Sequence, residues 1–321
     1  MIMRFEKEFN TLKYIIKKSN RVLLFAHTRP DSDSTGANLA LKYHLLGLGK
    51  HVDIGCFDPF PSYLEGLFKS EQFLHPDKID FNSYDAIIAS DSVERGFADV
   101  KNQISEDKVI VLIDHHPDIS FEGDVTIIDE NYSSASEIIF DYLEFSKGNI
   151  DTKIATFLLT GILGDTGNLQ HSNTTSKVMQ ATATLINKGA SVSKIVNSVF
   201  TNSKISTLKL WGRAFDKAKI NPKNKMIATV ITQKDLDDCD ATYDDIAEVA
   251  SILNTVPETS FSLVLSERKD GIIKGSLRSE EYKGVNVSEI AHTFGGGGHR
   301  LSSGFEIKGK IVEKKFGWEI M

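Results

Sequence analysis

An apolar run at residues 109–113 that ends in Asp114, His115 and His116 constrains the fold of this chain more than any other stretch. Five successive valines, isoleucines and leucines are typical of a strand that is buried on both faces, as in a parallel sheet covered by helices. The three polar residues would lie where this strand ends. Because open α/β sheets bind ligands at the carboxyl ends of their strands, the stretch also predicts the position of a site.

Other apolar runs alternate with amphipathic segments along the first half of the chain. Strands are predicted at residues 21–27, 51–57, 84–91 and 125–128, and helices at residues 5–16, 37–48, 63–68, 133–145 and 152–163. Ser34 or Thr35 is the expected N-cap of the second of these helices, and Ser133 or Ser134 is the expected N-cap of the fourth. Strands that alternate with helices indicate an α/β fold with a doubly wound, mainly parallel sheet.

The second half of the chain predicts a separate, smaller domain. Helices are expected at residues 178–185, 192–200 and 205–218, before Asn221 and Pro222 break the chain. The next elements are a strand at 226–232, a helix at 243–256, a hairpin at 260–278 turning at 269–271, and a helix at 286–294 capped by Asn286. We therefore expect a first domain at 1–188, a helical linker at 189–222 and a smaller α/β domain with a mixed sheet at 223–321.

Charge and cysteine content argue against several classes of protein. The chain has 321 residues, a formal net charge of -7 and a pI of about 5.8, which is not the basic character of a protein that binds long nucleic acids through phosphate contacts. Cys56 and Cys239 lie far apart, as expected for buried thiols in a reducing compartment. Residues 1–16 lack a signal-peptide core, and no apolar run approaches about 18 residues. We expect a cytoplasmic protein without a membrane span.

Histidines and aspartates gather where the predicted strands and one helix end. They are His27, Asp31, Asp33, Asp91, Asp114, His115, His116 and Asp165. Each has an ordinary explanation by itself, since the aspartates that follow His27 could cap a turn and Asp165 could belong to a simple loop. Buried together on one side of a sheet, however, such groups would repel or stay unpaired, and a divalent metal is the usual remedy. The set predicts a metal centre.

The spacing of Asp31 and Asp33 lets one loop serve two ions, because the two side chains can point to different sides of the turn. Asp91, at the end of a strand, is well placed to bridge them. Two ions roughly 3.5 to 4 Å apart can activate a water and neutralise a phosphoryl group during in-line displacement. The mixture of histidine and carboxylate ligands suits Mn²⁺, with Mg²⁺ or Co²⁺ as alternatives.

These residues, in this order over about the first 190 positions, resemble the four motifs of the DHH phosphoesterase superfamily. The four glycines at 295–298 with His299 resemble the signature of the superfamily's first type of associated C-terminal domain. The two resemblances together span nearly the whole chain. The subgroup that the chain most resembles is that of the stand-alone nanoRNase and phosphoadenosine-phosphate phosphatase proteins, whose size and two-domain plan it shares.

The resemblance implies six metal ligands and two Mn²⁺ ions per chain. One ion would be held by His27, Asp31 and Asp91, and the other by Asp33, Asp91, His115 and Asp165. His116 would face the substrate phosphate and Asp114 would orient the two histidines, so that these two residues and the bridging Asp91 form the expected catalytic group. Ser32 departs from the glycine that relatives commonly carry, which leaves the conformation of this loop open.

The glycine run could bring backbone amides close to an anion, with a hydrogen bond from His299 in addition. A flexible linker is the alternative for a bare run of glycines. The resemblance implies a substrate site in this domain, formed by Arg278, Gly296, Gly297, Gly298, His299 and Ser303. Arg278 matches the family's substrate-binding arginine, for which a surface salt bridge is the alternative explanation. Ser302 and Ser303 stand where small apolar residues are frequent.

These observations predict a Mn²⁺-dependent phosphodiesterase and phosphatase whose first domain cuts and whose second domain binds the substrate. The expected substrates are short single-stranded RNA, cut to mononucleotides, and nucleotides with a terminal phosphate such as 3',5'-adenosine bisphosphate. Alternatives are cleavage of linear dinucleotides such as pApA, a single-strand exonuclease and, in a different class, a non-catalytic nucleotide- or RNA-binding module. A family of inorganic pyrophosphatases shares the motifs of the first domain but has a different second domain. A homodimer is left open.

Overall fold

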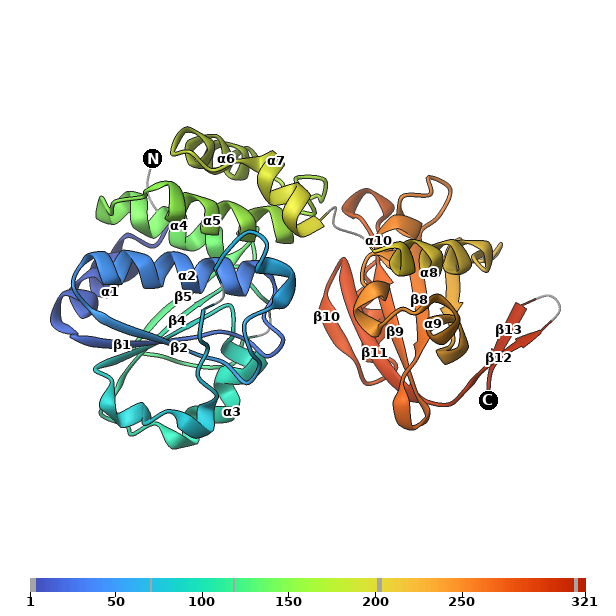
Figure 1. Ribbon diagram of the computed structural model, residues 1–321, viewed down its shortest axis with the longest axis horizontal. Coiled ribbons are helices and arrows are strands. Elements are labelled where there is room, and N and C mark those ends of the chain that lie inside the picture. Colours follow the sequence, from blue (N-terminus) through green and yellow to red (C-terminus); the bar gives the residue numbers. More distant parts are fainter. Residues whose placement is uncertain (1–3, 70, 118, 201–203, 315–316) are drawn as a thin grey trace. The chain divides into compact units, whose positions relative to one another are not determined.

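The computed structural model describes residues 4–69, 71–117, 119–200, 204–314 and 317–321. The chain divides into two units, Met1–Asn202 and Ser203–Met321, and each has its own hydrophobic core (Figure 1). In the described ranges, no helix combines the length and the apolar character needed to cross a membrane.

Five parallel strands form the sheet of the first unit. They are β1 (Arg21–Phe25), β2 (His51–Gly55), β3 (Ala86–Ser90), β4 (Val109–Asp114) and β5 (Val125–Ile128), in the order β2-β1-β3-β4-β5. Every residue of β3 is buried, and in β4 only Val109 is partly exposed. This burial explains why the two central strands are continuous apolar runs, and it confirms the predicted parallel α/β sheet.

Helices cover both faces of this sheet, as a doubly wound fold requires. On one face lie α1 (Glu6–Lys18), α2 (Ser32–Gly47), α4 (Ala135–Ser146) and α5 (Thr152–Asp165), with α6 (Ser176–Asn187) packed against α5 (Figure 1). The other face is covered by α3 (Ala98–Val100) and the turns on either side of it, Val93–Phe97 and Lys101–Gln103. Phe97 and Val100 pack there against Phe25 and Leu112.

The start of α2 differs from the prediction. The helix begins at Ser32, and its N-cap is Asp31 rather than Ser34 or Thr35, so the predicted caps were wrong. Asp31 Oδ1 accepts hydrogen bonds from the backbone amides of Asp33 and Ser34, each at 3.0 Å. A carboxylate that satisfies two amides of the first turn leaves the later hydroxyls free to lie inside the helix. The helix predicted at 63–68 is also shorter, a single turn at Ser62–Leu64.

The second unit contains a mixed sheet of six strands. They are β6 (Lys219–Ile220), β7 (Met226–Ile231), β8 (Phe261–Glu267), β9 (Ile272–Arg278), β10 (Gly297–His299) and β11 (Ser302–Lys308), in the order β10-β11-β9-β8-β7-β6. Only the β7–β8 pair is parallel among these described strands. The β8–β9 hairpin turns at Lys269–Gly271, as predicted. A separate pair, β12 (Ile311–Lys314) and β13 (Gly317–Ile320), lies near the end of the chain.

Helices α8 (Ile205–Asp216), α9 (Gln233–Cys239) and α10 (Val249–Asn254) pack on one face of this sheet, and α11 (Val287–His292) packs on the other. The helix predicted at 243–256 is interrupted, because a short turn at Tyr243–Ile246 precedes α10. Some of the residues expected as a linker belong to the core of the first unit, and others belong to the core of the second. Ile195 of α7 (Val192–Ile195) is buried in the first unit, and Leu210 of α8 is buried in the second.

Candidate metal centre

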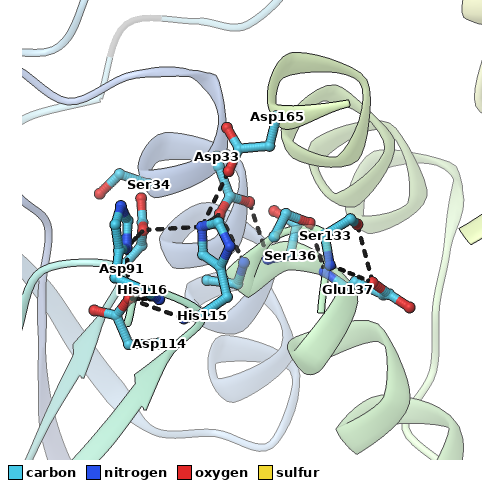
Figure 2. Close-up of polar contacts among 12 residues, drawn as sticks. Asp33, Ser34, Asp91, Asp114, His115, His116, Ser133, Ser136, Glu137 and Asp165 are labelled. Carbon is cyan, nitrogen blue, oxygen red and sulfur yellow. Dashed lines mark hydrogen bonds and ion pairs between the residues drawn. The ribbon is translucent and has the colours of Figure 1, made fainter. Parts of the chain in front are cut away.

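The carboxyl edge of the first sheet collects all eight histidines and aspartates singled out from the sequence. Figure 2 labels all of them except His27 and Asp31. β1 leads into His27, β3 into Asp91 and β4 into the Asp-His-His run, while α2 begins at this edge and α5 ends there. Among these residues there are three groups, and within each group the possible ligand atoms lie within 4.8 Å of one another. They are His27 with Asp31 and Asp91, Asp33 with His115 and Asp165, and Asp91 with His115 and His116.

His27 is fully buried and faces two carboxylates. Its Nε2 lies 3.2 Å from Asp31 Oδ2 and 3.5 Å from Asp91 Oδ2, while its Nδ1 lies 2.8 Å from the carbonyl oxygen of Thr28. A carbonyl oxygen can only accept, so Nδ1 carries the proton and the lone pair of Nε2 points at the carboxylates. Neither this Nε2 nor Asp91 Oδ1 has a hydrogen-bond partner among the described residues. A divalent cation fits this arrangement of donors.

His115 faces a second set of carboxylates. Its Nε2 lies 3.0 Å from Asp165 Oδ2, 3.7 Å from Asp91 Oδ1 and 3.9 Å from Asp33 Oδ2. Asp91 therefore directs one carboxylate oxygen toward His27 and the other toward His115. One carboxylate shared between two clusters of donors is the arrangement that a pair of bridged metal ions requires.

The backbone of Asp91 is left-handed, with φ 56°, which is uncommon for a residue other than glycine. Hydrogen bonds hold it on both sides. The amide of Asp91 donates to Ile113 O at 2.9 Å, the hydroxyl of Ser92 donates to Phe25 O at 2.6 Å, and Asn38 Nδ2 donates to Ser90 O at 3.1 Å. Such a conformation costs on the order of 1–3 kcal/mol and persists where the surroundings enforce it. Here the left-handed backbone orients the Asp91 carboxylate, which both clusters of donors share.

Asn38 was not predicted from the sequence. It is fully buried in α2, and its Nδ2 also donates to Ser34 O at 2.8 Å, so it ties the start of α2 to the end of β3. The signal that could have found it is an amide side chain beside the apolar run at residues 39–41, where it has to satisfy its polar atoms inside the core.

The N-terminus of α4 holds Asp33. Asp33 Oδ2 accepts from the amide of Ala135 at 2.7 Å, and Oδ1 accepts from the amide of Ser136 at 2.9 Å. The predicted cap of α4 is confirmed, because the Ser134 hydroxyl accepts from the amide of Glu137 at 3.1 Å. Glu137 in turn accepts from the amide and the hydroxyl of Ser133 (Figure 2). A helix N-terminus stabilises a carboxylate and fixes its direction, a role that the sequence did not indicate.

Asp114 orients both histidines that follow it. Its Oδ1 accepts from the backbone amides of His115 and His116, at 2.8 and 3.0 Å, and from His116 Nδ1 at 2.7 Å, while Oδ2 accepts from the amide of Val93 at 3.3 Å. Burial raises the pKa of Asp114, but the hydrogen bond and positive charge of His116 outweigh it, so the pKa is lowered. Asp114 thus stays ionised and holds the His116 ring by its Nδ1.

Three of the other carboxylates, those of Asp33, Asp91 and Asp165, resist ionisation when no cation is present. Burial and the nearby Asp165 raise the pKa of Asp33 to about 7, and partial burial and Asp31 raise the pKa of Asp165 to about 8. Burial and Asp33 raise the pKa of Asp91 well above its ordinary value. The edge of the sheet therefore holds more negative charge than its own histidines compensate, which is the electrostatic setting in which divalent cations bind.

In the second unit, three of the predicted substrate residues lie on one face of the sheet edge. Ser302 pairs with Arg278 on one side and with His299 on the other, and directly opposed residues of antiparallel strands point to the same face. Gly297 lies opposite Gly304 on that face. Arg278, His299 and Gly297 thus line one surface across β9, β11 and β10.

Ser303 and Gly298 lie on the opposite face, and the Ser303 hydroxyl donates to His299 O at 2.6 Å. The glycine run is a strand and turn rather than an open loop. A Cβ at Gly296 would lie 2.1 Å from Gly304 O, and Gly298 has φ +134° with its Cβ position 2.7 Å from Ser302 O. Close packing against β11 thus explains these two glycines, whatever else the run binds.

Two domain families match the chain. Residues 21–162 match the N-terminal domain of the DHH family, and residues 223–316 match the DHHA1 domain. The first match contains seven of the eight residues at the edge of the sheet, and Asp165 follows its last residue closely. The second match contains Arg278, the glycine run and His299.

Several relatives match nearly the whole length of the chain. A bifunctional oligoribonuclease and PAP phosphatase NrnA from Bacillus subtilis is 29% identical over 295 residues, covering 89% of each chain. A probable bifunctional oligoribonuclease and PAP phosphatase NrnA from Streptococcus mutans is 27% identical over 301 residues, covering 92% of each chain. The crystal structure of an exopolyphosphatase-related protein from Bacteroides fragilis superposes with a TM-score of 0.86 at 23% identity, covering 95% of this chain and 92% of the other. This last similarity establishes the fold.

Proposed function

Because the chain consists of a DHH family N-terminal domain followed by a DHHA1 domain, we propose that it is a metal-dependent phosphoesterase. It hydrolyses short single-stranded RNA to mononucleotides and removes a phosphate from 3',5'-adenosine bisphosphate. The observation that carries the proposal is Asp91, which directs one oxygen toward His27 and the other toward His115. The relatives that match about nine-tenths of the chain, and whose names give these two activities, support the choice of substrates.

In this proposal the donors form two metal sites that share Asp91. His27, Asp31 and Asp91 hold one ion, and Asp33, Asp91, His115 and Asp165 hold the other. When bound, the ions supply an activated water and stabilise the charge of the phosphoryl group. Imidazole nitrogens mixed with carboxylates favour Mn²⁺, with Mg²⁺ and Co²⁺ as the alternatives.

The residues around the ligands have separate tasks. Asp114 holds the Nδ1 proton of His116, so the far nitrogen of this ring is the one that meets the substrate phosphate. In the second unit, Arg278 and His299 bind the substrate as hydrogen-bond donors for a phosphate, since they lie on the same face of the sheet. Recognition by a few such groups suits a short substrate and agrees with the acidic character of the chain.

One experiment tests the proposal against its alternatives. The Mn²⁺-loaded protein is incubated with end-labelled RNAs from two to about twenty nucleotides long, and with adenosine bisphosphate, pApA and pyrophosphate. We expect the shortest RNAs and adenosine bisphosphate to be hydrolysed fastest. Faster cleavage of pApA or of long strands would instead indicate a dinucleotide phosphodiesterase or an exonuclease. Binding without turnover would leave a nucleotide-binding module.

Asp91→Asn is the matched inactive control. Asparagine tolerates the left-handed backbone, so this variant keeps the local conformation and removes only the shared negative charge. We expect at least a ~10³-fold loss of kcat, in line with the removal of a group that stabilises the transition state, together with an unchanged circular dichroism spectrum. Retained turnover would rule out the two-metal arrangement.

A further inference from the structure

Glu94 and Arg95 adjoin each other in the loop after β3, but their side chains have different surroundings. Glu94 Oε1 accepts from the amide of Ser120 at 2.9 Å and from its hydroxyl at 3.1 Å. The Arg95 side chain is exposed and makes no hydrogen bond or ion pair with any residue in the described ranges. The carboxylate of Glu94 is therefore bound within the protein, whereas the guanidinium of Arg95 is available to bind a ligand.

The backbone of this loop is nevertheless tied to the metal centre. Thr28, the residue after His27, donates its amide to Arg95 O at 2.9 Å, and Val93 donates its amide to Asp114 Oδ2 at 3.3 Å. Gly96 has φ +127°, and a Cβ there would lie 3.4 Å from Thr28 N, so a glycine lets the loop approach this closely. Arg95 is thus attached at a fixed place while its guanidinium remains unbound.

Arg95 lies at the edge of the sheet where the candidate ligands gather. It follows the shared ligand Asp91 by four positions, in the loop that leaves β3 at this edge. The exposed guanidinium therefore extends from a backbone position beside the metal centre.

We propose that Arg95 is a phosphate-binding residue that contacts an oxygen of the reacting phosphate group. A phosphate that approaches this edge meets five aspartates, Asp31, Asp33, Asp91, Asp114 and Asp165, and an additional cation offsets that repulsion. A guanidinium offers two parallel N–H donors to phosphate oxygens, and an exposed one can turn toward the substrate as it binds. The inference rests on the proposed function for the identity of the substrate, but not for the binding of phosphate itself.

The test measures phosphate binding and turnover separately. Inorganic phosphate is titrated calorimetrically into the Mn²⁺-loaded full-length protein, and kcat and KM are measured with adenosine bisphosphate. We expect Arg95→Ala to weaken phosphate binding about tenfold and to lower kcat/KM by about 10²-fold, the effect of losing one donor to a developing oxyanion. Arg95→Lys should recover part of the phosphate affinity and part of kcat/KM, because lysine keeps the positive charge but lacks the two parallel N–H donors of the guanidinium.

Arg21→Ala is the matched control. Arg21 is also an exposed arginine of this unit, but it lies at the start of β1, at the opposite edge of the sheet, where it covers the Tyr84 ring. We expect the control to match the wild type in phosphate affinity and kcat/KM, and we expect all three variants to keep the wild-type Mn²⁺ affinity and melting temperature.

Three outcomes would overturn the assignment of Arg95. They are unchanged phosphate affinity and kcat/KM in Arg95→Ala, loss of Mn²⁺ binding in that variant, and absence of phosphate binding by the wild-type protein. A wild type that binds phosphate but hydrolyses neither RNA nor adenosine bisphosphate would contradict the proposed function alone. The phosphate titration of the variants would then still decide the role of Arg95.

Discussion

Asp91 shows how much of the site depends on the conformation of one residue. Its left-handed backbone turns the carboxylate so that one oxygen faces His27 and the other faces His115. An extended residue at the same place would continue β3 and direct its side chain to one face of the sheet only. Asp and Asn tolerate this conformation better than most residues. The residue that supplies the shared ligand is thus also one of the few that suits the turn.

The raised pKa values of Asp33 and Asp165 predict an unusual pH dependence of stability. Their pKa values in the folded protein are about 7 and about 8, and aspartate in an unfolded chain has a pKa near 3.9. Between these values the folded state binds more protons than the unfolded state, so the free energy of unfolding falls as the pH rises. In the presence of a chelator, we expect a loss on the order of a few kcal/mol between about pH 5.5 and pH 8.

Urea unfolding at the two pH values measures this loss, and Mn²⁺ should restore stability at the higher pH. Asp33→Asn is the informative variant, because it removes one of the titrating groups and should flatten the dependence. A wild-type protein that gains stability with rising pH in the absence of metal would contradict this reading of the site.

At the scale of a secondary-structure element, α4 both packs on the sheet and holds a ligand. Its first two amides donate to Asp33, and its N-cap, Ser134, accepts from the amide of Glu137. α2 has a similar double role, because its own N-cap, Asp31, accepts two amides through Oδ1 and faces His27 through Oδ2. Helix starts at this edge therefore connect local helix stability to the geometry of the ligands.

Ser134→Ala tests this connection, with Thr175→Ala as its counterpart in α6. Thr175 is the N-cap of α6, where its hydroxyl accepts from the amide of Val178 at 3.3 Å. Loss of a cap costs about 0.5–2 kcal/mol, so both variants should lose similar stability. Only Ser134→Ala should also weaken Mn²⁺ binding, as measured by calorimetric titration. Equal Mn²⁺ affinities in the two variants would show that the start of α4 has no influence on Asp33.

At the scale of the whole molecule, the two units have separate cores, and the predicted metal ligands all lie in the first. Both tryptophans of the chain, Trp211 and Trp318, belong to the second. Tryptophan fluorescence therefore reports on the unfolding of the second unit, while circular dichroism reports on both.

We expect Mn²⁺ at about 100 times its dissociation constant to stabilise the first unit by about 2.7 kcal/mol, or roughly 5–10 °C in melting temperature for a unit of this size. Addition of EDTA should remove this increase from the circular dichroism transition and leave the fluorescence transition unchanged. An equal shift of both transitions would contradict a metal centre confined to the first unit.

The sequence alone determined the parallel sheet, the mixed sheet and the residues at the carboxyl edge. Buried strands need continuous apolar runs, and parallel strands end at a common edge, so His27, Asp91 and the Asp-His-His run could be placed together from short stretches of chain. Strong local signals, such as the serine that caps α4 and the glycine in the β8–β9 turn, also predicted their elements.

Only the tertiary structure decided how these residues meet. The amides of α4 that hold Asp33 lie about a hundred positions away from it, Asn38 reaches Ser90 on another element, and strand register turns Ser303 away from Arg278. The left-handed turn at Asp91 and the unbound guanidinium of Arg95 likewise depend on contacts from several segments. A local pattern determines the type of element, but distances between side chains from distant segments depend on how the elements pack.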